Sequence, residues 1–351
     1  NKLQSLIIFP VSRYKNDDFW LISSSYTEPY KLCIVSPLVG LDISYHIETI
    51  RQEPHVYDSS GVVVERHETT SMDGTKVKYF MVYKADPRHG EDTPKNMTAI
   101  LHGYGGFGLM HCKPNYDKLM GFFWLQKGFV YCDANIRGGG EHVDWRQGCI
   151  KGQIHKSFED FEAIAKDLIK KGVTSRSKLG CWGVSHGGLL TANMLTRNTQ
   201  LFGAIVSEQP LLDLEAVNSE KCQHWTSYYG DSNVPDDWKY MQNISPYHML
   251  EESSKTYCPA LFITSKNDYV CPPGQARRMT QRLQDMGFRS TTYFYEFRQK
   301  EHGRSPTLKN RAYKHQLVYQ FFNFFLNRDI NDNVSSAVHH SNQMEKAKTS
   351  A

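Results

Sequence analysis

From about residue 97 onward, short apolar runs alternate with segments of helical periodicity. The runs typical of buried strands lie at residues 97–101, 128–136, 178–183, 203–207, 259–264 and 291–296. Segments with apolar residues at helical spacing lie at residues 158–169, 187–195, 274–286 and 311–327. Buried strands that alternate with helices predict a parallel sheet covered by helices on both faces. The chain is therefore expected to contain an α/β domain.

The segment before this alternation has a different pattern. Residues 18–22 and 30–35 read as strands on either side of a polar stretch, and two strands cannot bury a core alone. We expect residues 1–66 to be the last part of a larger β-domain. The strand patterns at 61–66 and 77–83 flank Asp73-Gly74, which predicts a hairpin. A second domain is expected over residues 67–330. The polar residues 331–351 lack aromatic side chains and are expected to form a disordered tail.

Charge, hydropathy and cysteine usage exclude several classes of protein. Lys and Arg number 41 against 37 Asp and Glu, a balance that does not favour binding to nucleic acid or an anionic membrane. The densest apolar runs, 121–125 and 321–326, are too short to span a bilayer. Eight scattered cysteines without zinc spacing indicate reduced thiols. We therefore expect a cytoplasmic protein without a membrane segment.

The motif Gly183-Val-Ser-His-Gly187 fits the pattern G-x-S-x-G. It follows an apolar strand and opens a helix, which is the context that a nucleophile elbow requires. The sharp turn strains the serine backbone, and a glycine on each side leaves room where a Cβ would clash. An ordinary helix N-cap would explain Ser185 but neither glycine. Ser185 is therefore the candidate nucleophile.

A serine nucleophile needs a base that is itself oriented by a carboxylate, in the chain order Ser, acid, His. Asp268 follows the apolar strand at 259–264, and His302 lies between the strand at 291–296 and the last helix. Either residue alone could be an ordinary surface residue of a loop. Together they fit one order and one edge of the sheet, which favours a Ser185–Asp268–His302 triad.

The negative charge that develops during acyl transfer needs hydrogen-bond donors close by. The backbone N–H of His186, directly after the nucleophile, is one candidate. A second is expected from the Gly-rich loop at residues 102–108. That loop lacks the G-K-[ST] ending of a phosphate-binding P-loop, and the mechanism needs neither a metal nor an organic cofactor.

Several motifs in order resemble the prolyl oligopeptidase family, whose members combine an α/β-hydrolase domain with a seven-bladed β-propeller. They are Gly103-Tyr-Gly-Gly-Phe107, Ala134-Asn-Ile-Arg-Gly-Gly-Gly-Glu141, Gly183-Val-Ser-His-Gly-Gly-Leu-Leu190, Leu201-Phe-Gly203, Trp225-Thr-Ser-Tyr-Tyr-Gly230 and Ser245-Pro-Tyr247. The resemblance covers about residues 15–327 and implies the same triad. It also implies that the Tyr104 hydroxyl joins the His186 amide in the oxyanion hole.

The same resemblance implies a substrate pocket shaped for proline. Trp225 would stack on the proline ring, and the implied walls are Phe107, Leu211, Tyr229 and Cys271. A flat apolar slot suits a ring that has no N–H to satisfy. Residues 223–229 contain no carboxylate of the kind that relatives cutting after basic residues place there. Val270 departs from the family, which commonly has an arginine at this position that contacts a substrate carbonyl.

Taken together, these features predict a serine endopeptidase that cleaves short peptides after proline through an acyl-enzyme. Two alternatives stay open: an oligopeptidase or esterase of other specificity on the same scaffold, or an inactive truncated fragment that binds peptides. Residues 1–66 resemble only the final part of the family's propeller plus its return linker, so we expect a fragment or truncated product. The expected partners are short proline-containing peptides, and the full-length form is expected to be a monomer.

Overall fold

The computed structural model describes residues 3–12, 17–38, 44–85, 94–142, 144–145, 149–217, 225–251, 255–298, 302–303 and 307–327. The chain divides into two compact units. One comprises residues 1–66, 81–92 and 113–130, and the other comprises residues 67–80, 93–112 and 131–351. The boundary predicted at residue 66 stays a prediction. The tail predicted at 331–351 lies outside the described residues, as does Cys222, one of the eight cysteines.

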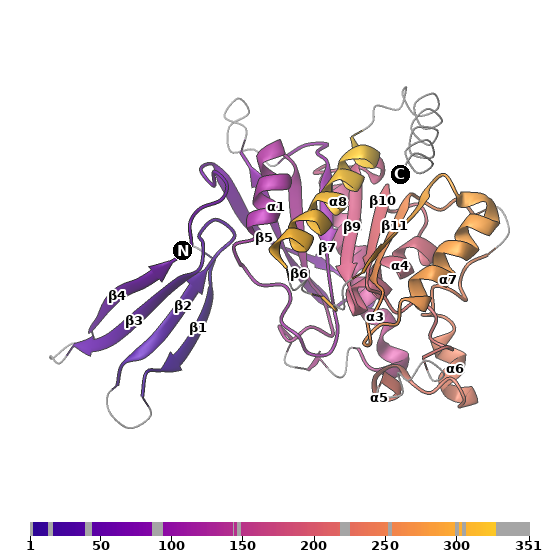
Figure 1. The fold of residues 1–351 in the computed structure, drawn as a ribbon, viewed down its shortest axis with the longest axis horizontal. Coiled ribbons are helices and arrows are strands. Elements are labelled where there is room, and N and C mark those ends of the chain that lie inside the picture. Colours follow the sequence, from indigo (N-terminus) through magenta and orange to yellow (C-terminus); the bar gives the residue numbers. More distant parts are fainter. Residues whose placement is uncertain are drawn as a thin grey trace. The chain divides into compact units, whose positions relative to one another are not determined.

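An eight-stranded sheet carries the architecture, with the strand order β12-β11-β10-β9-β7-β8-β6-β5 (Figure 1). Its strands are β5 (Val62–Thr70), β6 (Lys76–Lys84), β7 (Ala99–His102), β8 (Val130–Asn135), β9 (Leu179–Val184), β10 (Ala204–Glu208), β11 (Ala260–Ser265) and β12 (Thr292–Phe297). The neighbours from β7 through β9, β10 and β11 to β12 pair in parallel. The carboxyl ends of these five strands therefore meet at one edge of the sheet.

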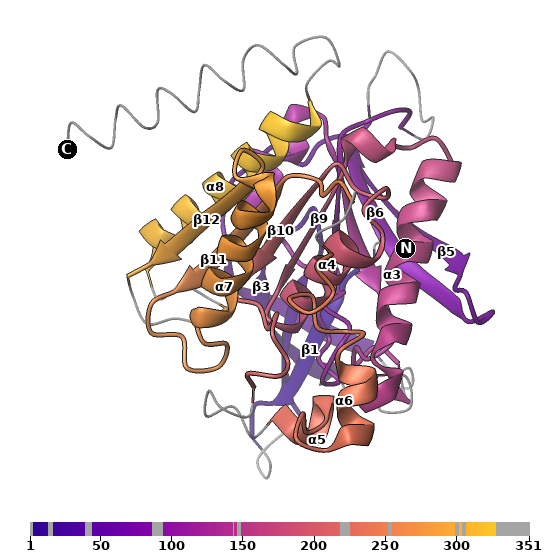
Figure 2. The same cartoon turned by 90° about the vertical axis from the view of Figure 1, so that its right-hand side faces the viewer.

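Helices cover both faces of this sheet. The helices are α1 (Lys118–Phe123), α3 (His155–Lys170), α4 (His186–Arg197), α5 (Thr226–Tyr229), α6 (Pro235–Met241), α7 (Gly274–Leu283) and α8 (Leu308–Leu326). Helix α8 lies on one face, and α3 and α4 lie on the other (Figures 1 and 2). This arrangement confirms the predicted α/β architecture. Among the described residues, no helix combines the length and the apolar character needed to cross a membrane.

Most elements lie where the sequence periodicity predicts them, and two differences have local causes. Helix α7 ends at Leu283 and continues as a π-helical turn over Gln284–Phe288, because Gly287 adopts a φ of 95°. The short helices α1, α5 and α6 were not expected, since four to seven residues form no more than about two turns, too few for a repeated apolar spacing to be recognised. The predicted hairpin is present, and Ser71 N–H donates to Thr75 O at 2.8 Å across its turn.

The first unit contains a four-stranded antiparallel sheet in sequential order. Its strands are β1 (Ser5–Pro10), β2 (Phe19–Ser24), β3 (Lys31–Leu38) and β4 (Ser44–Gln52). The sequence predicted only the two central strands. Strand β4 was missed because all nine of its residues are exposed, so that it lacks the alternation of a half-buried strand. The interpretation of this sheet as the end of a propeller stays a prediction.

A buried ion pair fixes the loop after β8 to helix α3. The Arg137 guanidinium donates to both oxygens of Asp160, through Nε at 2.9 Å to Oδ2 and through Nη2 at 2.7 Å to Oδ1. The Arg137 backbone N–H also donates to Asp160, whose side chain is fully buried. Arg137 contacts Asp73 as well, and this hydrogen bond lowers the pKa of the Asp73 carboxyl well below its ordinary value. The two carboxylates together satisfy one partly buried guanidinium.

We predict that Asp160→Ala lowers the free energy of unfolding by about 3 kcal/mol, because it leaves the Arg137 charge inside the fold with only its outer partner. Urea unfolding followed by circular dichroism measures this loss. The control Lys166→Ala breaks an exposed pair with Glu162 on the same helix and should change stability by no more than about 0.5 kcal/mol. Equal effects of the two substitutions would contradict a role of Asp160 as an anchor.

Candidate active site

Ser185 lies at a sharp turn between β9 and α4. Its φ of 59° and ψ of −114° fall in a region that residues with a Cβ rarely adopt. A Cβ at Gly183 would lie 2.3 Å from Gly187 O, and one at Gly187 would lie 2.5 Å from Gly103 O. The two glycines therefore allow the close backbone approach that the turn requires. Ser185 N–H donates to Glu208 O at 2.8 Å, which joins the turn to the end of β10.

The structure brings the three predicted side chains of the triad together. His302 Nε2 lies 3.0 Å from Ser185 Oγ, and His302 Nδ1 lies 2.8 Å from Asp268 Oδ2. Asp268 follows β11 and His302 follows β12, so both are supplied by the edge of the sheet at which Ser185 emerges. These contacts span 117 and 34 residues of sequence.

The surroundings of Asp268 determine which nitrogen of His302 faces Ser185. Asp268 Oδ1 accepts the N–H groups of Val270 and Cys271, each at 2.9 Å, and the side chain is fully buried. An ionised carboxylate can only accept hydrogen bonds, so His302 Nδ1 carries the proton. His302 Nε2 then presents its lone pair to the Ser185 hydroxyl. This is the arrangement that a general base needs.

Two donors lie beside Ser185. Burial raises the pKa of Tyr104 well above its ordinary value, against a smaller lowering effect of the Ser185 side chain, so the Tyr104 hydroxyl stays protonated. His186 is the first residue of α4, and the N–H groups of a first helical turn have no acceptor within the helix. Both groups are therefore available to an oxyanion that forms at Ser185.

The His186 side chain has a structural task that the motif does not reveal. Its Nε2 lies 3.1 Å from Gly105 O and its Nδ1 lies 2.7 Å from the Tyr229 hydroxyl. A carbonyl oxygen only accepts, so Nε2 carries the proton and Nδ1 accepts from Tyr229. Burial, with a smaller contribution from the nearby His111, lowers the pKa of His186 to about 4, against the raising effect of the hydrogen bond to Gly105 O. A neutral imidazole thus ties the Gly-rich loop to α5.

An aromatic cluster adjoins these residues. The Phe107 ring centroid lies 5.1 Å from that of Trp225 and 6.0 Å from that of Tyr229, so three of the predicted pocket residues lie together. Tyr228, which the sequence analysis missed, stacks on Phe107 at 3.8 Å, and its hydroxyl accepts the Phe107 N–H at 3.1 Å. The signal was available, because positions 225, 228 and 229 share one face of a helical turn.

The remaining predicted pocket residues occupy different surroundings. Cys271 Sγ lies 3.8 Å from Ser185 Oγ, and its side chain is buried. Leu211 is buried in the segment after β10, and its role as a wall stays a prediction. Val270 O accepts the Trp225 indole N–H at 3.2 Å. The backbone at Val270 therefore holds the aromatic ring.

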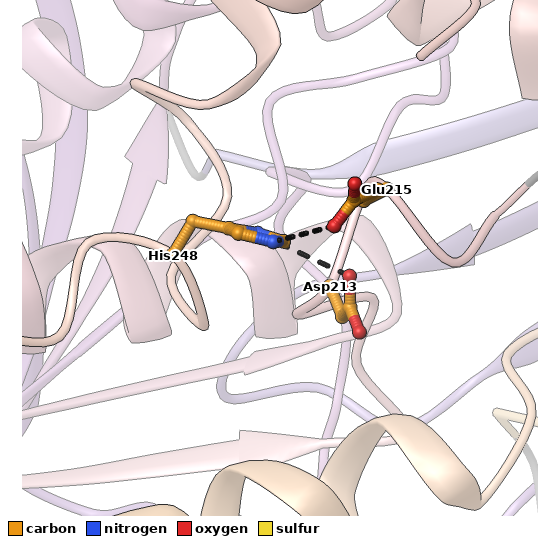
Figure 3. Close-up of side chains that lie close together, drawn as sticks. All are labelled: Asp213, Glu215 and His248. Carbon is orange, nitrogen blue, oxygen red and sulfur yellow. Dashed lines mark hydrogen bonds and ion pairs between the residues drawn. The ribbon is translucent and has the colours of Figure 1, made fainter. Parts of the chain in front are cut away.

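A second group of titratable side chains consists of Asp213, Glu215 and His248 (Figure 3). His248 Nε2 lies 3.0 Å from Glu215 Oε2, and His248 Nδ1 lies 4.0 Å from Asp213 Oδ1. Arg278 Nη2 lies 3.1 Å from Asp213 Oδ2, so a protein cation already compensates this carboxylate. Ser245 Oγ is hydrogen-bonded to His248 Nδ1 at 2.9 Å. The cluster is therefore explained by its own ion pairs.

The lowered pKa of His186 predicts a specific acid sensitivity. The unfolded chain binds a proton at this residue below pH 6.5, whereas the folded protein binds it only below about pH 4. Stability from this residue is therefore lost as the pH falls from about 6.5 to 4, with about 2 kcal/mol gone at pH 5. We expect His186→Gln to lose about 2 kcal/mol less than the wild type between pH 7 and pH 5 in urea unfolding. Identical losses would contradict the prediction.

Comparisons with known proteins identify relatives of this chain. The sequence matches the prolyl oligopeptidase family over residues 116–329. An uncharacterised peptidase of Sinorhizobium fredii is 34% identical over 87% of this chain and 40% of its own length. The prolyl endopeptidase of Dictyostelium discoideum is 26% identical over 84% of this chain and 40% of its own length.

Solved structures give the same result. A post-proline cleaving enzyme from Rickettsia typhi superposes with a TM-score of 0.81 and 28% identity, covering 92% of this chain and 45% of that one. The chain thus spans less than half the length of these relatives. The match over residues 116–329, together with the shared fold, shows that the chain belongs to the prolyl oligopeptidase family.

Proposed function

We propose that this chain hydrolyses peptide bonds on the carboxyl side of proline in short peptides, with Ser185 as nucleophile. The observation that carries the proposal is the continuous line of contacts from Asp268 Oδ2 through His302 to Ser185 Oγ, at 2.8 and 3.0 Å. The three groups stand in the order acid, base and nucleophile that acyl transfer requires.

In the acylation half, Ser185 Oγ attacks the substrate carbonyl carbon while His302 Nε2 takes the hydroxyl proton. The carbonyl π-electrons move to oxygen and give a tetrahedral oxyanion. As the oxyanion collapses, the C–N bond breaks and His302 returns the proton to the leaving amine. Asp268 stays ionised throughout and stabilises the imidazolium between these two transfers.

In the deacylation half, water replaces the amine. His302 Nε2 removes a proton from the water as its oxygen attacks the acyl carbon, and it then donates that proton to Ser185 Oγ as the ester bond breaks. The Tyr104 hydroxyl and the His186 amide donate to the oxyanion in both halves. Because the Tyr104 hydroxyl is buried and protonated, it needs little reorganisation when the negative charge forms.

The preference for proline rests on the aromatic cluster and on the relatives. The partly exposed Phe107 and Trp225 pack with the buried Tyr229, and Cys271 lies next to Ser185. Leu211 is the further wall of the proposed pocket. A proline ring has no N–H that such an apolar surface would leave unsatisfied. The segment Trp225-Thr-Ser-Tyr-Tyr229 contains no carboxylate to attract a basic side chain. Two relatives are described as a prolyl endopeptidase and a post-proline cleaving enzyme.

We predict that a fluorophosphonate probe labels the wild type and not Ser185→Ala, and that this substitution lowers kcat by several orders of magnitude. The reason is that the variant has lost the only atom that forms the acyl bond. Cys33→Ala, a substitution in the first unit, is the control and should be labelled like the wild type. A folded wild-type sample that resists the probe would favour an inert peptide-binding fragment instead.

The specificity prediction concerns three otherwise identical peptides with Pro, Ala or Lys before the scissile bond. We expect kcat/KM to be highest for Pro, by at least about tenfold, because only the ring fills the aromatic slot. Trp225→Ala should reduce the preference for Pro more than it reduces cleavage after Ala. Equal kcat/KM values for all three peptides would instead support an oligopeptidase or esterase of broader specificity.

A further inference from the structure

The residue that follows His302 is held at both of its backbone polar groups. Gly303 N–H donates to Gln209 Oε1, and Gly303 O accepts from Lys314 Nζ at 2.8 Å. Gly303 also has a φ of 73°, so its two peptide groups point in directions that an ordinary strand or helix would not give them. Two side chains from outside the loop therefore determine the path of the backbone at the imidazole.

Lys314 reaches this position as part of a buried ion pair. Its ammonium group contacts Glu208 Oε1, and both side chains are nearly inaccessible to solvent, at 5% and 1% exposure. Glu208 Oε2 accepts the Trp182 indole N–H at 3.3 Å. A charged pair in the interior stabilises a fold less than its contacts suggest, because both ions lose their hydration. Because burying the Lys314–Glu208 pair costs hydration free energy, packing alone does not account for its presence.

Gln209 is fixed as firmly as Lys314. Its backbone φ of 45° lies in the left-handed region, and its N–H donates to Ile263 O at 2.6 Å. The side-chain amide donates to Ser265 Oγ at 3.1 Å, which leaves the carbonyl oxygen directed at Gly303 N–H. Strained residues of this kind are found preferentially at functional sites.

Glu208, the residue directly before Gln209, also holds the turn of the nucleophile. Glu208 O accepts Ser185 N–H at 2.8 Å, while its side chain anchors Lys314. Gln209 contacts the loop of His302 directly. The end of β10 is thus a common support for the turn that carries Ser185 and the loop that carries its base, two segments that lie 117 residues apart in sequence.

We propose that Gln209 and Lys314 are positioning residues that hold His302 at hydrogen-bonding distance from Ser185 by fixing both peptide groups of Gly303. The proposal rests on the proposed function, because Gln209 and Lys314 can affect catalysis only if His302 acts as the base. Neither side chain contacts Ser185 Oγ or takes part in a proton transfer. Their effect is on the geometry of the imidazole, and small misplacements of a catalytic group reduce rates about 100-fold.

Gln209→Met tests the first contact. Methionine keeps the length of the side chain and removes the acceptor for Gly303 N–H. We expect kcat and the rate of fluorophosphonate labelling to fall together, by about 10- to 100-fold, with little change in KM. Gln209→Glu retains an acceptor oxygen, and the Ser265 hydroxyl can turn to donate to it, so this variant should recover most of the lost kcat.

The matched control is Gln275→Met. Gln275 is equally buried, and its Oε1 accepts the N–H groups of Leu212 and Asp213 at 2.8 and 2.7 Å. This change should lower stability to unfolding by a similar amount and leave kcat unchanged. A purely structural role for Gln209 predicts that the two variants behave alike in both measurements, which would overturn the proposal.

Lys314 needs a variant that does not leave Glu208 charged and alone. The double substitution Glu208→Gln with Lys314→Met removes both charges and keeps an acceptor for Trp182. We expect it to fold and still to show reduced kcat, because Gly303 O has lost its donor. Glu208→Gln alone keeps Lys314 and should retain more activity than the double variant.

The outcomes separate the two levels of the proposal. If the wild type is active and Ser185→Ala is not, but Gln209→Met and the folded double variant keep full kcat, the positioning role fails and the serine mechanism stands. If the wild type itself lacks Ser185-dependent activity and labelling, the proposed function fails first. Loss of kcat in Gln209→Met, recovery in Gln209→Glu and an unchanged Gln275→Met together support the inference.

Discussion

The candidate active site depends on the hydrogen bond between His302 Nδ1 and Asp268 Oδ2, 2.8 Å long, which orients the imidazole toward Ser185. This hydrogen bond places the imidazole proton on the side away from Ser185 and leaves the lone pair of Nε2 facing the hydroxyl. Two backbone N–H groups that donate to the other Asp268 oxygen hold the carboxylate in this orientation. These donors and acceptors lie in loops at one edge of a parallel sheet. The direction of the strands therefore brings together the groups that the chemistry needs.

Much of this could be predicted from the sequence because its determinants are local. Apolar runs and helical spacing locate the strands and helices, and the glycines around Ser185 specify the turn that exposes it. The convergence of Asp268 and His302 follows from a topological rule, since parallel strands end at the same edge. The rule locates residues to an edge but not to a distance, so the contact of 3.0 Å at Ser185 required the structure.

Other features have no periodic signature. Gln209 and Lys314 are polar residues in segments that otherwise read as buried, and their partner Gly303 lies 94 and 11 residues away from them. Nothing in a hydropathy pattern distinguishes a buried lysine with a partner from a misplaced one. Strand β4 shows the reverse difficulty, because a strand with every residue exposed carries no burial pattern. Long-range polar contacts and solvent-facing edges are therefore the parts that sequence reasoning misses.

The left-handed backbone of Ser185 also determines which side chains the position can accept. Threonine offers the same hydroxyl, but its second branch at Cβ makes a positive φ far more costly. Cysteine, unbranched and of similar size, meets no such obstacle. Main-chain sterics at this turn thus limit which nucleophilic side chains the scaffold could acquire during evolution, favouring a primary alcohol or a thiol over a secondary alcohol.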